Sequence, residues 1–77
     1  MDKKIRIYST PYCVYCKMAK EFFTEKGLIY EEFDVSENVE KRKEMIDKSG
    51  QMGVPVIEIG DEIIIGFDKA RINELVK

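Results

Sequence analysis

Four short segments of the chain have the apolar pattern of β-strands. In the first of them, Ile5 and Ile7 alternate with charged residues, so one face of the strand is apolar and the other is polar. The last two segments are separated by Gly60-Asp61, a pair suited to the tight turn of a β-hairpin. The predicted strands are residues 4–8, 28–35, 54–59 and 62–65.

An amphipathic helix is predicted soon after the first strand. Val14, Met18 and Phe22 recur every four positions, with Ala19 and Phe23 beside them, which predicts an amphipathic helix over residues 14–26. Gly27 is a suitable residue to end it, because glycine adopts the left-handed conformation without strain. We therefore expect Met18 to contribute to the core.

Two further helices are predicted from their capping residues. Ser36 precedes a stretch with acidic residues in its first turn and Gly50 at its end, which predicts a second helix capped by Ser36, with Met45 buried. Asp68 is placed to cap a short last helix. The order β-α-β-α-β-β-α combines a right-handed parallel βαβ unit with an antiparallel hairpin. We predict an α/β fold, a four-stranded mixed sheet flanked by three helices.

Length and composition limit the kind of protein. The 77 residues are 44% hydrophobic and 36% charged, which fits one small domain spanning residues 1–77 with a thin core. A formal net charge of −2 argues against a nucleic-acid partner. Apolar runs such as residues 63–65 are far below the roughly 20 residues that a membrane helix needs, so we expect a soluble, cytoplasmic protein.

The two cysteines, Cys13 and Cys16, are the first chemical signal. A small secreted domain held by disulfides usually has about four or more cysteines, and a bridge closing so short a loop gives little stabilisation. The chain contains no histidine, which excludes a Cys/His zinc site and a histidine base, and we predict no metal site. The pair is therefore poorly explained as a structural bridge.

The position of the pair at the start of the first helix assigns different roles to the two thiols. Cys13 lies near unpaired backbone N–H groups and the positive end of the helix dipole, which favour its thiolate form. Cys16 follows one turn later on the same face, within reach of a disulfide but shielded by the helix. In thiol–disulfide exchange, Cys13 then attacks and Cys16 resolves. The alternative is a pair of packed, inert side chains.

A proline stands where a central strand is expected to begin. Pro55 has no backbone N–H to donate to the sheet, so its position must be special. One explanation is a cis Val54-Pro55 bond that exposes the backbone of Val54 beside the cysteines for pairing with an extended substrate. The other is an ordinary proline at the start or edge of a strand. The pattern alone leaves both open.

Three motifs carry a resemblance to a known family. They are Tyr-Ser-Thr-Pro-Tyr-Cys-Val-Tyr-Cys at residues 8–16, Gly53-Val54-Pro55, and Ile65-Gly66-Phe67-Asp68. In this order and spacing they resemble the glutaredoxins, and more closely the short bacterial glutaredoxin-like and NrdH-redoxin branch. The resemblance covers essentially the whole chain. It implies the thioredoxin fold, a cis bond before Pro55 and disulfide reduction as the activity.

The sequence departs from the family pattern mainly at the glutathione site. Val14 replaces the proline usual between the two cysteines, and Thr10 stands where glutathione-binding members typically have a lysine. Gly53 takes the place of a threonine, and Ile65 that of the first of two glycines. The parts of the implied substrate or glutathione site that remain are Tyr15, Val54, Pro55, Gly66, Phe67 and Asp68.

The resemblance implies a thiol–disulfide oxidoreductase that reduces protein or glutathione mixed disulfides, with glutathione as reductant and no tightly bound cofactor. One alternative is an NrdH-like electron donor reduced by thioredoxin reductase, with ribonucleotide reductase or a peroxide- or methionine-sulfoxide-reducing enzyme as recipient. Another is an iron–sulfur carrier, a dimer in which Cys13 of each chain and two glutathiones supply four thiolates. A structural adaptor that does not use its thiols is the third. We expect a monomer.

Overall fold

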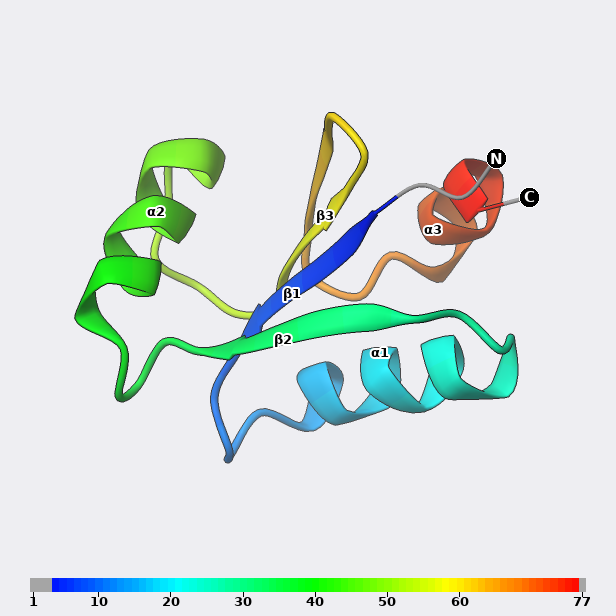
Figure 1. The fold of residues 1–77 in the computed structure, drawn as a ribbon, viewed down its shortest axis with the longest axis horizontal. Coiled ribbons are helices and arrows are strands. Elements are labelled where there is room, and N and C mark those ends of the chain that lie inside the picture. Colours follow the sequence, from blue (N-terminus) through cyan, green and yellow to red (C-terminus); the bar gives the residue numbers. More distant parts are fainter. Residues whose placement is uncertain (1–3, 77) are drawn as a thin grey trace.

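The helices and strands of the chain follow the predicted order (Figure 1). The computed structural model describes residues 4–76. Its strands begin and end within two residues of the predicted limits, a difference typical of element ends. The elements are β1 Ile5–Ser9, α1 Val14–Glu25, β2 Tyr30–Asp34, α2 Val39–Ser49, β3 Val56–Ile59, β4 Glu62–Ile65 and α3 Lys69–Val76.

The four strands form one mixed sheet in the order β2-β1-β3-β4, as predicted. β1 runs parallel to β2, and β3 is antiparallel to both β1 and β4. Tyr8 of β1 pairs with Val56 of β3, which in turn pairs with Ile65 of β4. The end of β1, the start of β3 and the end of β4 therefore lie at the same end of the sheet. This register brings the three motifs of the sequence together.

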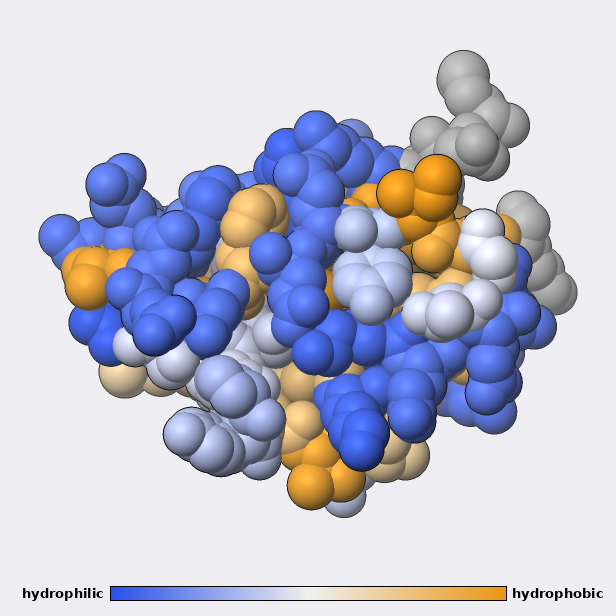
Figure 2. Space-filling model, turned by 60° about the horizontal axis from the view of Figure 1, so that its bottom comes forward, coloured by the Kyte–Doolittle hydropathy of each residue, from blue (hydrophilic) through white to orange (hydrophobic). Residues whose placement is uncertain are grey.

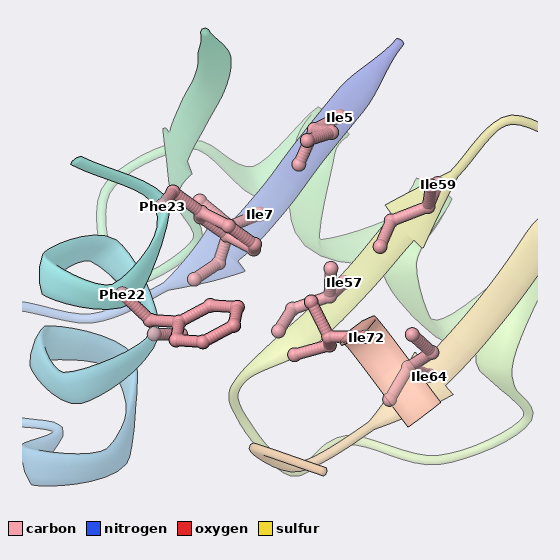
Figure 3. Close-up of a cluster of buried hydrophobic side chains, with 9 residues drawn as sticks. Ile5, Ile7, Phe22, Phe23, Ile57, Ile59, Ile64 and Ile72 are labelled. Atoms are coloured by element: carbon pink, nitrogen blue, oxygen red, sulfur yellow. The ribbon is translucent and has the colours of Figure 1, made fainter. Parts of the chain in front are cut away.

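The larger core lies between the sheet and the helices α1 and α3. Phe22 and Phe23 of α1 and Ile72 of α3 point toward isoleucines of β1, β3 and β4 (Figure 3). Side chains of this cluster are at most 7% exposed. Burial of each Ile or Phe stabilises the fold by roughly 1.5–3 kcal/mol. The cluster thus holds α1, which carries the two cysteines, firmly against the sheet.

A smaller core lies on the opposite face of the sheet, under α2. It contains Tyr8 and Met45, so the predicted burial of Met45 is confirmed. The Tyr8 hydroxyl donates a 2.7 Å hydrogen bond to Glu44 Oε1. That bond, together with contacts from Lys41 and Lys48, lowers the pKa of the Glu44 carboxyl to about 2. A fully buried tyrosine therefore connects the core to a charged network at its edge.

The predicted burial of Met18 is wrong, because α1 turns a different face to the sheet. Its buried residues are Cys16, Ala19, Phe22 and Phe23. Met18 is 42% exposed and Val14 68%. At about 100° per residue, these two lie roughly 110° to 150° around the helix from the centre of the buried group. Phe22, Ala19 and Phe23 belong to the predicted apolar set and are buried, whereas Val14 and Met18 are not.

The N-cap of α2 is Asn38, and the prediction of Ser36 is wrong. The Asn38 side chain accepts a 3.0 Å hydrogen bond from the Lys41 N–H, which satisfies one of the free donors of the first turn. Ser36 instead donates its N–H and hydroxyl to Asp34 Oδ1, at 2.9 and 2.5 Å. The helix ends as predicted at Gly50, whose φ of 74° is left-handed.

One surface of the molecule is mostly hydrophilic, with hydrophobic residues in separate spots (Figure 2). Among residues 4–76, none of the helices has the length and apolar character needed to span a bilayer.

The β3–β4 turn is formed by Gly60 and Asp61 as predicted, with Gly60 at a φ of 60°.

Candidate active site

Cys13 is the N-cap of α1, where the chain leaves β1 and enters the helix. Its Sγ accepts a 3.1 Å hydrogen bond from the Cys16 N–H, one of the donors that a first helical turn leaves free. Its N–H donates to Thr10 O at 3.4 Å, and its own carbonyl accepts from the Lys17 N–H at 3.2 Å. Cys13 as a residue is half-buried, whereas Cys16 is buried.

Cys16 lies one turn further along α1, in the same position relative to Cys13 as the sequence predicts. Its side chain is fully buried. Burial, and secondly a hydrogen bond with the Cys13 side chain, raise the pKa of the Cys16 thiol to about 12. Cys16 is therefore much less accessible than Cys13, and its thiol loses a proton less readily than the thiol of a free cysteine.

The second motif lies at the start of β3. The Val54-Pro55 peptide bond is cis, as the family resemblance implies. Pro55 is buried and Val54 half-buried, and the Pro55 carbonyl accepts a 2.8 Å hydrogen bond from the Gly66 N–H. Pro55 precedes the first residue of β3, so no sheet hydrogen bond depends on the missing N–H. The hydrogen bond from the Gly66 N–H to the Pro55 carbonyl joins the second motif directly to the third.

Gln51 is a residue of this segment that the sequence analysis missed. Its side-chain amide accepts a 2.7 Å hydrogen bond from the Gly53 N–H and donates a 3.0 Å bond to the Gly53 carbonyl. A Cβ at Gly53 would lie 2.7 Å from the Gln51 Oε1. Gln51 thus shapes the backbone that leads to Val54. No motif marks a glutamine at this spacing, so no pattern in the sequence identifies it.

The third motif joins β4 to α3. Gly66 has a φ of 82°, in the left-handed region that favours glycine. Phe67 packs edge-on against Phe22 of α1, with ring centroids 5.9 Å apart. Asp68 Oδ1 accepts a 3.2 Å hydrogen bond from the Arg71 N–H, so the prediction that Asp68 caps the last helix is confirmed.

Large exposed hydrophobic side chains are concentrated in the segments that carry these motifs. Two lie elsewhere, Ile29 beyond the end of α1 and Val39 at the start of α2. The remaining exposed hydrophobic residues, which we call the apolar rim, are Tyr12, Val14, Tyr15, Met18, Met52 and Ile65. Tyr12, Val14 and Tyr15 directly adjoin the two cysteines in the chain.

The fold and the site together define the class of this protein. A four-stranded mixed sheet with three helices, with a Cys-x-x-Cys pair at the start of the first helix, is a thioredoxin-like fold carrying a dithiol. Among residues 4–76, no three Cys, Asp or Glu side chains are grouped so that they could hold a metal ion. The chemistry that this site supports is thiol–disulfide exchange.

Comparison with known proteins identifies the family. The glutaredoxin family model matches residues 5–64. The chain is 44% identical over 73 residues to an uncharacterized glutaredoxin-like 8.6 kDa protein in the rubredoxin operon of Clostridium pasteurianum, covering 95% of this chain and 97% of that protein. It is 39% identical over 64 residues to glutaredoxin 3 of Escherichia coli, covering 83% and 77%. The glutaredoxin-like NrdH-redoxin of Escherichia coli has a similar structure, with a TM-score of 0.84, 30% identity and 96% of each chain covered.

The chain belongs to the glutaredoxin family. Members of this family are thiol–disulfide oxidoreductases and need no tightly bound cofactor. The Cys13/Cys16 dithiol of this chain is consistent with that activity.

Proposed function

We propose that this protein reduces disulfides through Cys13 as the attacking thiol and Cys16 as the resolving thiol. The observation that carries the assignment is the contrast between a half-buried Cys13 at the helix N-terminus and a fully buried Cys16. Cys13 forms a mixed disulfide with one sulfur of the substrate and releases the other. Cys16 then attacks the Cys13 sulfur and releases the bound substrate as a thiol.

The proposed substrate site is built from the three motifs. Val54 lies two residues before the first residue of β3, so its main chain is outside the sheet ladder and is free to pair with an extended substrate. Pro55 fixes that segment, and Gly66, Phe67 and Asp68 form the adjoining turn and helix start. Tyr15, which is 61% exposed beside Cys16, completes the predicted set.

The proposed recipients are disulfides of proteins. The apolar rim places exposed apolar side chains in the segments that carry the motifs, and exposed apolar area favours contacts with apolar side chains of a protein substrate. Ribonucleotide reductase and the enzymes that reduce peroxides or methionine sulfoxide are the recipients we propose. We place the protein in the cytoplasm, where thiols are kept reduced.

Glutathione is the proposed reductant, acting weakly. The proposed pairing of a substrate with the main chain of Val54 supports glutathione binding. Against it, Thr10 supplies no positive charge for a glutathione carboxylate. Ile65, which is 56% exposed, also occupies space that a glycine would leave open. The loss of one exposed charge contact costs on the order of 1 kcal/mol, or several-fold in affinity. The similarity to NrdH-redoxin supports thioredoxin reductase as the alternative reductant.

Trapping of the mixed disulfide tests the roles of the two cysteines. The Cys16→Ser variant is expected to accumulate a mixed disulfide on Cys13, visible as an added mass that a reductant removes. The Cys13→Ser variant serves as its counterpart and is expected to be inactive in every assay. Accumulation of a mixed disulfide on Cys16 in the Cys13→Ser variant, with none on Cys13 in the Cys16→Ser variant, would reverse the assignment.

Two turnover rates on one small disulfide test the reductant. We expect slow but measurable turnover with millimolar glutathione and glutathione reductase. If glutathione does not reduce the Cys13–Cys16 bond while thioredoxin reductase does so readily, the glutathione-dependent function is wrong and the NrdH-like one replaces it.

A further inference from the structure

The resolving step requires a fully buried thiol to lose its proton. This inference rests on the proposed role of Cys16. In that step the Cys16 S–H loses its proton, its sulfur forms a bond to Cys13 Sγ, and the bond from Cys13 to the substrate breaks. The substrate sulfur leaves with the electron pair and takes up a proton, so no further oxidant or reductant is needed. Negative charge therefore develops on Cys16 inside the protein, where it is costly unless a positive charge is near.

Lys20 is the cation of α1 placed to meet that charge. It follows Cys16 by four residues and so lies on the same side of the helix, one turn later. Helical side chains lean toward the N-terminus of their helix, which directs Lys20 over the turn that contains Cys16. Against the effect of burial, a hydrogen bond with the Thr10 backbone lowers the pKa of the Cys16 thiol, and the Lys20 charge lowers it further.

The Lys20 side chain is held in place by the sheet. Its Nζ donates a 2.7 Å hydrogen bond to Glu32 Oε2 on β2, and the same oxygen accepts a 3.0 Å bond from the Ser9 hydroxyl on β1. Ser9 is 1% exposed and is the buried polar side chain at the end of β1. The Lys20 side chain is 28% exposed. This ion pair thus bridges α1 and two strands beside the resolving cysteine.

Other titratable groups lie near this pair, and Lys17, Glu21 and Glu25 of α1 line the same surface hollow as Lys20 and Glu32. Cys13 faces Cys16 from the same helix, and its side chain raises the pKa of the Cys16 thiol. From β2, Tyr30 and Asp34 also act on Lys20, besides Glu32. The hydrogen bond with Glu32 raises the pKa of the Lys20 ammonium, which keeps it charged through neutral pH.

We propose that Lys20, anchored by Glu32 and Ser9, is a positioning residue whose charge promotes the attack of Cys16 on the mixed disulfide. The first step, the attack of Cys13 on the substrate, does not depend on it. Removal of the Lys20 charge should therefore slow the second step and leave the rate of the first step unchanged.

Rapid mixing of the reduced protein with Ellman's reagent separates the two steps. Attack by Cys13 releases one thionitrobenzoate, and resolution by Cys16 releases the second. With Lys20→Met, we expect the second phase to slow by up to about threefold at neutral pH and the first phase to be unchanged. The size follows from a compensation: each unit added to the pKa of an attacking thiol lowers its thiolate fraction tenfold but raises its nucleophilicity about threefold.

Three comparisons separate this charge effect from a merely structural one. Lys20→Arg is expected to restore most of the second-phase rate. Added salt is expected to slow the second phase of the wild-type protein but not that of Lys20→Met, because Lys20 is partly solvent-accessible. Lys43→Met, which removes an exposed positive charge from α2, is expected to leave both phases unchanged.

The outcomes distinguish this inference from the proposed function. If the wild-type protein shows no second phase, Cys16 is not the resolving thiol and the proposed function is wrong. If the second phase is present but Lys20→Met leaves its rate and its salt dependence unaltered, only the role of Lys20 is wrong. Equal slowing of both phases would also overturn it, as would failure of Lys20→Arg to restore the rate.

Discussion

Selective alkylation of the two cysteines follows directly from the burial of Cys16. A thiol with a pKa of about 12 is about one part in 100,000 thiolate at pH 7, against about 3% for a free cysteine of pKa about 8.5. Iodoacetamide reacts with the thiolate, and the higher nucleophilicity that accompanies a higher pKa recovers part of this loss, so the pKa difference slows Cys16 on the order of 100-fold relative to a free thiol. Burial of the sulfur slows it further. Half-buried Cys13 is therefore expected to react well before Cys16.

The assay is a time course of iodoacetamide at about pH 6 to 7, followed by peptide mass spectrometry of each cysteine. The unfolded protein in guanidinium is the control, since both thiols then have ordinary environments. We expect single modification at Cys13 in the folded protein and modification of both residues in the unfolded one. Modification of Cys16 at a similar rate in both states, or before Cys13, would refute the reasoning.

Three further predictions concern stability. Tyr8→Phe is expected to lower the free energy of unfolding by about 1 kcal/mol at pH 7. Because the pKa of Glu44 is about 2 in the fold instead of 4.5, the ionised Glu44 carboxylate stabilises the fold above about pH 4.5, and this stabilisation is lost toward pH 2. In urea titrations, the difference in free energy of unfolding between wild type and Tyr8→Phe should therefore become smaller as the pH falls. A difference that does not change with pH contradicts the Tyr8–Glu44 contact. Asn38→Ala should cost about 1 kcal/mol in the same titration, and no change would mean that the cap is dispensable. Gly50→Ala, at a φ of 74°, should lower the thermal midpoint, whereas a rise would disprove the strain argument.

The order of elements was predictable because each of them has a strong local signal. Alternation around Ile5 and Ile7, the turn at Gly60-Asp61 and the cap at Asp68 depend on neighbouring residues only. The capping of α2 was not predictable in this way. Ser36 and Asn38 are both good caps, and the choice between them depends on Asp34, which engages Ser36 in a turn of its own.

The parts of the site that belong to sequence motifs were predictable. The two cysteines and the cis Val54-Pro55 bond belong to motifs that are read from the sequence. Side chains that meet across the fold were not predictable, because their contacts depend on the register of the strands. Lys20 reaches Glu32 only because β2 lies beside β1 under α1, and no pattern in the sequence joins these two residues.

The hydrogen bond that caps α1 links the folding of the chain to its redox potential. Cys13 Sγ accepts the Cys16 N–H in the reduced protein. A disulfide sulfur is a poorer hydrogen-bond acceptor than the sulfur of a free cysteine, so oxidation weakens the cap. The cap stabilises the fold of the reduced chain more than the fold of the oxidised chain. By a thermodynamic cycle, this difference in folding free energy appears as a difference in reduction potential between the folded and the unfolded protein. A cap of about 1 kcal/mol corresponds to about 20 mV for a two-electron couple and makes the folded protein a slightly weaker reductant. Substitutions in the first turn of α1 can therefore change the potential of the dithiol without contacting either sulfur.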